Sequence, residues 1–152
     1  MSDEAMELLR DVGFDPDRSV LTERQAVVLA LREQGYSQRE IADRLGTSRA
    51  NISSIESSAR SNITNARETV ALADSLAAPV RIRIDPGADI YTIPPEIYEA
   101  CDATRTKVAH SSAEIVRIIR ETVPEAIDDD VTAEPIVLTV TGDGTLTVRE
   151  SR

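Results

Sequence analysis

The side chains best suited to a recognisable chemistry lie close together between positions 47 and 60, a segment rich in hydroxyl, amide and guanidinium groups. Arg49 could donate two parallel hydrogen bonds to a guanine edge, Ala50 could contact a thymine methyl group, and Asn51 could pair with adenine. Two plainer alternatives stay open: Asn51 could bond only to the preceding turn, and Arg49 could bind only a phosphate. The residue types therefore favour recognition of duplex DNA. With two positions upstream, the candidate DNA-contacting residues are Gln38, Arg39, Thr47, Ser48, Arg49, Ala50, Asn51, Ser53, Ser54, Ser57 and Arg60.

These residues need two short helices that meet at a steep angle, and residues 38–57 have the spacing of such a helix-turn-helix unit. The closest approach of the helices requires a small residue, which is Ala42, and the turn requires a residue that accepts positive φ, which is Gly46. Ser37 and Glu40 can form a capping box that begins the first helix. Thr47 or Ser48 can cap the second helix. The predicted facing apolar residues are Ile41, Leu45, Ile52 and Ile55.

A third helix is predicted just before this unit. Thr22 and Gln25 can form a second capping box, and Gly35 marks the end of the helix. Three short helices of this kind make a minimal DNA-binding core. An ordinary helical hairpin with a glycine corner is the alternative, but the agreement of capped helices, turn and preceding helix favours DNA binding. The predicted apolar face of this third helix comprises Ala26, Val27, Leu29, Ala30 and Leu31.

The sequence resembles a known family over residues 21 onward. The run LTERQAVVLALREQGYSQREIADRLGTSRANISSIE is similar to the region-four helix-turn-helix of sigma factors and of response-regulator activators. The continuation ARSNITNARET and the tail VRIRIDPGADIYTIPPEIYEACD resemble the archaeal Tfx family of DNA-binding transcriptional regulators. This resemblance implies sequence-specific binding at promoters, a helix-turn-helix near the N-terminus and a separate C-terminal domain. The acidic extension at residues 1–20 lies outside it.

The second helix of the motif is predicted to continue far beyond a short recognition helix. Residues 48–78 contain neither glycine nor proline, and Pro79 ends the run. Apolar residues recur at steps of three and four and predict one continuous buried face. That face could be the seam of a homodimer, or it could pack against the same chain. Arg49, Arg60 and Arg67 lie beside it in one row, where Glu56 is expected to repel phosphate.

The predicted fold class is α+β, in three parts: an acidic N-terminal extension at 1–20, a helix-turn-helix domain with its long helix at 21–78, and a small α+β domain at 79–152. In the last part, alternation predicts strands at 80–84 and 90–93. Helices are predicted from Pro94 and after Ser111 or Ser112, the latter ending near Pro124. Residues 136–140 and 145–149 predict a hairpin around a glycine-rich turn.

The net charge of −10 conflicts at first sight with DNA binding, since cationic side chains normally neutralise phosphates. The acid is concentrated elsewhere: residues 1–20 have two Arg against six acids, and residues 111–134 have two Arg against seven. Lys107 is the only lysine. An acidic chain almost without lysine is expected of a protein adapted to concentrated salt, as in halophilic archaea. The alternative is an acidic surface that meets the transcription machinery.

Other functional classes find little support. No apolar run approaches the roughly 20 residues of a membrane span, and no secretion signal is evident, so we expect a cytoplasmic protein. Cys101 and His110 are single representatives of their types, which disfavours a metal site or a catalytic dyad. We therefore expect no enzyme, no cofactor and no metal, with Cys101 a small buried side chain and residues 128–130 a solvated loop. A helix-turn-helix protein that acts by binding the transcription machinery is the alternative function.

Overall fold

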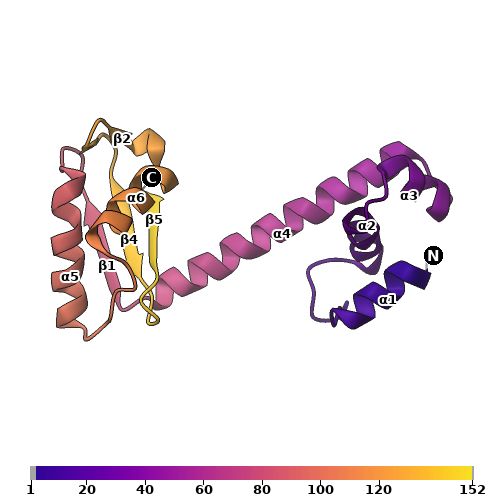
Figure 1. Ribbon diagram of the computed structural model, residues 1–152, viewed down its shortest axis with the longest axis horizontal. Helices are drawn as coiled ribbons and strands as arrows, with labels where there is room; N and C mark the ends of the chain where they lie inside the picture. Colours follow the sequence, from indigo (N-terminus) through magenta and orange to yellow (C-terminus); the bar gives the residue numbers. More distant parts are fainter. Residues whose placement is uncertain (1–2, 152) are drawn as a thin grey trace. The chain divides into compact units, whose positions relative to one another are not determined.

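The computed structural model describes residues 3–151 and divides the chain into two compact units, Met1–Val70 and Ala71–Arg152. The division falls inside α4, whereas the sequence predicts a boundary after residue 78. The assignment of domains at 1–20, 21–78 and 79–152 stays a prediction. The first unit comprises α1 (Asp3–Asp11), α2 (Glu23–Glu33), α3 (Gln38–Leu45) and most of α4 (Arg49–Ala77) (Figure 1).

The helix starts of the first unit follow the predicted capping chemistry. Thr22 and Gln25 form the capping box of α2, and Ser37 and Glu40 form that of α3. Gly46 ends α3 in the left-handed region, with φ of 65° and ψ of 40°. A residue with a Cβ would be strained there, so glycine permits the chain to turn directly from α3 into α4.

The core of the first unit joins helices that are short on their own. Val28, Leu31, Ile41 and Ile52 are fully buried and come from α2, α3 and α4. The acidic extension also contributes, because α1 packs against α2 and buries Ala5. The sequence pattern predicts no structure for this segment. Its acidic residues are exposed, whereas Ala5, Leu9 and the half-buried Phe14 belong to the core.

Helix α4 confirms the predicted long helix, since it continues without interruption for 29 residues. The predicted continuous buried face is wrong for this chain. Ile52 and Ala59 of that face are buried, but Val70 is 60% exposed, and Ala73 and Ala77 are exposed as well. Burial ends after Ala59 because the other helices of the first unit cover only the first part of α4.

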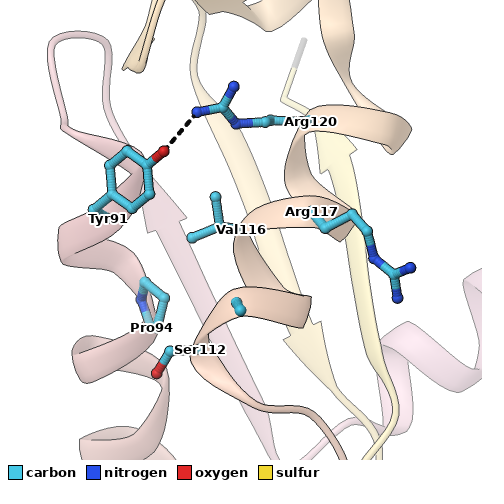
Figure 2. Close-up of a pocket in the computed structure, with 7 residues that line it drawn as sticks. Tyr91, Pro94, Ser112, Val116, Arg117 and Arg120 are labelled. Carbon is cyan, nitrogen blue, oxygen red and sulfur yellow. Dashed lines mark hydrogen bonds between the residues drawn. The ribbon is translucent and has the colours of Figure 1, made fainter.

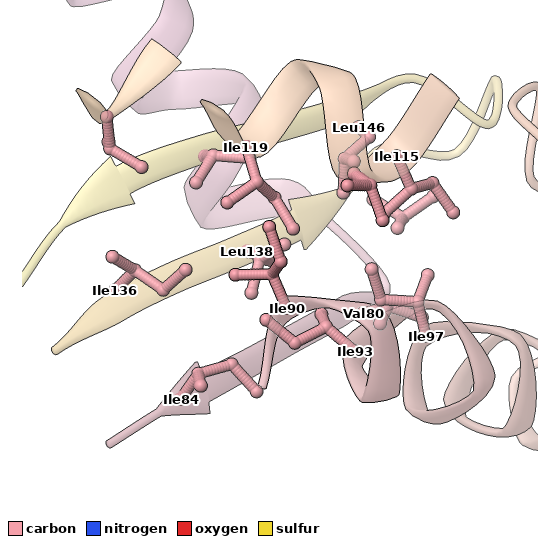
Figure 3. Packing of buried hydrophobic residues seen from close by; sticks show 14 of the residues in the cluster. Val80, Ile84, Ile90, Ile93, Ile97, Ile115, Ile119, Ile136, Leu138 and Leu146 are labelled. Carbon is pink, nitrogen blue, oxygen red and sulfur yellow. The ribbon is translucent and has the colours of Figure 1, made fainter. Parts of the chain in front are cut away.

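The second unit is an antiparallel three-stranded sheet covered by helices. Its order is β1 (Val80–Ile84), β4 (Ile136–Val140) and β5 (Leu146–Glu150), with Val80 opposite Val140 and Leu138 opposite Val148. Helices α5 (Ile93–Ala103) and α6 (Ser112–Thr122) pack on it and bury Ile97, Ile115 and Ile119 (Figure 3). These elements confirm the predicted α+β class, including the terminal hairpin and both helices. The remaining elements are η1 (Ile90–Thr92), η2 (Pro124–Ala126), β2 (Ile127–Asp128) and β3 (Val131–Thr132).

The predicted strand at 90–93 is wrong: these residues form η1 and the first residue of α5. The Asp89 side chain accepts a hydrogen bond from the amide of Tyr91 and caps the turn. Ile90, Ile93 and Ile97 are all buried, and their spacing of three and four residues is helical. The β-branched residues favoured a strand, but the proline pair that follows and the capping aspartate begin a helix.

The prediction of a buried Cys101 is confirmed, and the prediction of a solvated loop at 128–130 is confirmed only in part. Cys101 lies in the core of the second unit at 1% exposure, where burial and the charge of Asp102 raise the pKa of its thiol. The loop predicted at 128–130 is shorter: Asp128 ends β2, and the exposed Asp129 and Asp130 form the turn to β3, where Asp130 pairs with Arg120 from α6. Within residues 3–151, no helix has both the length and the apolar character needed to cross a membrane.

Candidate nucleic-acid interface

The first turns of α4 present the predicted DNA-contacting residues on an exposed face. The Ser48 hydroxyl accepts a hydrogen bond from the amide of Asn51 at 3.1 Å and caps the helix, as predicted. Arg49 and Ala50 then lie exposed, while Ile52 is fully buried against α2 and α3. Burial of Ile52 fixes the rotation of the helix about its own axis. The opposite side of the same turns therefore faces solvent.

The other candidate residues lie on or beside this face. Arg39, Ser53, Ser54, Ser57 and Arg60 are exposed, as are Ser48, Arg49, Ala50 and Asn51, whereas Gln38 and Thr47 are half-buried. The Asn51 amide donates to the Thr47 hydroxyl at 2.9 Å, which corresponds to the alternative in which Asn51 supports the turn. Its carbonyl oxygen has no hydrogen bond within residues 3–151. Arg39 and Arg49 likewise form no ion pair in the described chain, so their guanidinium groups are available to an external anion.

Glu56 does not extend into the arginine row as a repelling charge. It is only 6% exposed, and its carboxylate accepts hydrogen bonds from three side chains on three helices. Gln38 Nε2 of α3 donates to Oε2 at 3.0 Å, and Arg32 Nε of α2 lies 3.1 Å from Oε2. Arg60 of α4 donates to Oε1 through Nη2 at 2.9 Å and through Nε at 3.1 Å. Two guanidinium groups therefore surround this carboxylate, so the charge expected to repel phosphate is compensated.

The electrostatics of Glu56 agree with this geometry. Burial by itself would raise the pKa of Glu56, but hydrogen bonds from Gln38, Arg60 and Arg32 outweigh it, and the pKa lies below its usual value. A buried carboxylate stays ionised when charged hydrogen-bond donors replace the water it loses. Arg32 also donates to the carbonyl oxygen of Tyr36 at 2.9 Å. The cluster thus connects α2, the turn before α3, α3 itself and α4.

A second polar cluster attaches α1 to the motif. The Arg44 guanidinium of α3 lies 3.8 Å from the centre of the Tyr36 ring and 3.9 Å from the Glu4 carboxylate of α1. Tyr36 Oη also donates to Glu4 at 3.2 Å. The sequence pattern does not point to Arg32, Tyr36 or Glu4, because their partners lie far along the chain and meet them only after the helices pack. Arg44 and Tyr36 lie close in sequence but carried no signal of their own.

Family models match both parts of the chain. The model for region 4 of sigma-70 matches residues 19–64, which contain α2, α3 and the first half of α4. The model described as the C-terminal part of the DNA-binding protein TFX matches residues 66–148, more than half of the chain. The chain belongs to the Tfx family of DNA-binding proteins. The Tfx family is a family of transcriptional regulators and not of enzymes.

Relatives of this Tfx-family chain come from several archaea. A protein of Haloarcula marismortui, a halophile, carries the provisional name of transcriptional regulatory protein and is 52% identical over 143 residues, covering 94% of this chain and 90% of the relative. A protein of Methanocaldococcus jannaschii with the same provisional name is 41% identical, covering 72% of this chain and 80% of the relative. The DNA-binding protein Tfx of Methanothermobacter thermautotrophicus is 37% identical over 131 residues, covering 86% of this chain and 95% of the relative. These relatives confirm the family and archaeal kinship suggested by the sequence.

The C-terminal unit of this Tfx-family chain has a separate open pocket of about 510 Å³ between η1, the start of α5, and α6 (Figure 2). Pro94 and Val116 form apolar walls, and Arg120 Nη2 donates to Tyr91 Oη at 2.9 Å. Arg120 also forms an ion pair with Asp130. Asp130 therefore offsets the positive charge of this guanidinium.

Proposed function

We propose that the chain is a regulator that binds specific sequences of duplex DNA and reads the major groove with the first turns of α4. The observation that carries this proposal is the exposed Arg49, which has no ion pair among residues 3–151 and begins a helix held by buried Ile52. A guanidinium in that position can form paired hydrogen bonds with guanine O6 and N7. Ala50 and Ser53 lie on the same exposed face, where they would contact neighbouring bases.

The remaining candidates fit contacts with the sugar–phosphate backbone. Arg49 and Arg60 are separated by about 17 Å along the helix axis, at 1.5 Å per residue. This separation exceeds the roughly 12 Å width of the major groove, so Arg60 would reach a phosphate when Arg49 reaches a base. Arg39 lies in the first turn of α3, where the helix dipole favours a phosphate. Such contacts set the register on DNA, and base contacts then select the sequence.

Selection of duplexes from a random library by the full-length protein, in concentrated KCl, tests this function. We expect one sequence to be enriched, and we expect the protein to protect matching sites near genes in its genome. The alternative is that the helix-turn-helix binds the transcription machinery. Recovery of RNA polymerase with the protein, without enrichment of any sequence, would support that alternative and refute sequence-specific reading. DNA binding would also place the protein in the cytoplasm with the chromosome.

We also propose that the protein acts as a homodimer through the last turns of α4. Leu72 and Leu76 lie in the second unit, four residues apart on α4, and are 56% and 69% exposed, so they offer an apolar patch that a second copy could cover. A dimer would present two reading helices to paired half-sites. Light scattering after size exclusion should give the mass of two chains, and Leu76→Glu should give one chain. A wild-type monomer at micromolar concentration would refute the dimer.

A further inference from the structure

We propose that Glu56 is a positioning residue of the DNA interface: it holds Gln38 and Arg60 where they meet the DNA backbone on either side of the groove read by Arg49. This inference rests on the proposed function. Glu56 then supports DNA binding, although the charge pattern of the sequence alone predicts that it repels phosphate.

The convergence of side chains from three helices supports this role. One carboxylate with 6% exposure receives donors from α2, α3 and α4 at 2.9 to 3.2 Å. Arginine and glutamine have many rotamers, and ordering them on binding costs side-chain entropy. Hydrogen bonds to Glu56 order Gln38 and Arg60 already in the free protein. Less entropy is then lost when they contact DNA.

Glu56 does not consume the binding capacity of the groups that it holds. A guanidinium carries five N–H donors, and Arg60 uses Nε and Nη2 for Glu56. The Arg60 side chain is 54% exposed, so its remaining donors can reach a phosphate. Gln38 donates one N–H of Nε2 to Glu56, which leaves the second N–H of the same nitrogen, and the residue is half-buried at the start of α3. Each side chain is therefore anchored at one edge and open at another.

The charge balance of the cluster also fits DNA binding. Arg32 and Arg60 supply two positive charges to the single negative charge of Glu56, so the cluster as a whole is positive. The distance from the buried carboxylate to these guanidinium groups is shorter than the distance at which a phosphate could approach the carboxylate. Removing the negative charge therefore disturbs the orientation of the donors more than it relieves repulsion.

The test compares Glu56→Gln with Asp43→Asn, a control that removes the same charge. Asp43 lies exposed on α3 and forms no ion pair among the residues that the structure describes. The probes are the duplex enriched by the wild-type protein and a duplex of permuted sequence. We expect Glu56→Gln to bind the enriched duplex about tenfold more weakly than Asp43→Asn. Binding to the permuted duplex should weaken as well, because contacts to the sugar–phosphate backbone form on any sequence.

Two results would overturn the proposal. If Glu56→Gln binds both duplexes as tightly as Asp43→Asn, the carboxylate acts only as a negative charge. If its melting temperature falls while the folded protein keeps wild-type affinity and salt dependence, Glu56 serves only the fold. Failure to enrich any sequence would instead refute the proposed function itself, and the positioning role with it.

A second variant keeps the proposal testable if Glu56→Gln does not fold. Gln38→Ala removes one donor from a half-buried position without changing any charge. We expect it to weaken binding to both duplexes severalfold, because a contact to the DNA backbone does not depend on sequence. Where both variants fold, Gln38→Ala should reduce the affinity for the enriched duplex less in the Glu56→Gln background than in the wild-type background. Fully additive losses would show that Glu56 does not act through Gln38.

Discussion

Replacement of Arg49 by Ala is the most direct perturbation of the proposed interface. Arg49 is exposed, begins α4 and forms no ion pair within the described chain. Its removal should therefore leave the fold intact. A cation in the first turn opposes the helix dipole, so stability should stay unchanged or rise by about 0.3 to 1 kcal/mol. Any loss of DNA affinity then reports a lost contact with DNA.

The magnitude of that loss follows from the contact that the guanidinium can make. A bidentate contact to guanine is worth about 1 to 3 kcal/mol, which corresponds to a rise in Kd of about 5- to 150-fold. Loss of a phosphate contact would instead weaken binding to all sequences. It would also lower the slope of log Kd against log KCl by about 0.9. Arg49→Lys separates the two cases, because lysine keeps the charge but cannot form the paired hydrogen bonds.

The assay is fluorescence anisotropy with the enriched and permuted duplexes across a series of KCl concentrations. Arg24→Ala provides a matched control, since Arg24 is exposed in the first turn of α2 and is not a candidate contact. We expect Arg49→Ala to lose affinity for the enriched duplex and Arg24→Ala to lose little. Equal affinities of Arg49→Ala and wild type for the enriched duplex would refute the assignment of Arg49 to the interface.

Three further predictions concern stability. A Cβ at Gly144 would lie 2.2 Å from the Lys107 carbonyl oxygen at φ of +90°, so Gly144→Ala should cost about 3 kcal/mol or more, measured by urea unfolding, whereas Gly142→Ala has open space and should cost under about 1 kcal/mol. Equal effects of the two glycine variants would contradict this close approach of the two backbone segments. The pKa of Glu56 lies below its usual value of 4.5, so its stabilisation is present above that pH and is lost as the pH falls through its lower folded-state pKa. Melting temperatures in acid should decrease less steeply for Glu56→Gln than for wild type, and parallel decreases would refute the contribution of this group. With a net charge of −10, the fold should melt at higher temperature as KCl rises from dilute to molar, and a melting temperature independent of salt would contradict adaptation to concentrated salt.

Much of the helix-turn-helix was predictable because its determinants are local. Capping boxes at Thr22 and Ser37 and the left-handed Gly46 involve residues three or four positions apart, and each appears in the structure as predicted. Local rules failed at residues 90–93, where β-branched residues suggested a strand. The capping Asp89 and the helical spacing of Ile90, Ile93 and Ile97 were present in the sequence but were outweighed by composition.

The candidate site likewise has features that local sequence determines and features that only tertiary packing determines. The sequence by itself predicts which residues lie on the exposed face of α4, above all Arg49. The turn at Gly46 and the apolar Ile52 are local signals, and together they decide which side of the helix faces outward. The environment of Glu56 depends on tertiary structure. Arg32 lies 24 residues away and Gln38 lies 18 residues away, so only the packing of α2 and α3 against α4 brings both to its carboxylate. Periodicity assigned Glu56 a position beside the arginines, but burial and three hydrogen-bond donors decide what its charge does.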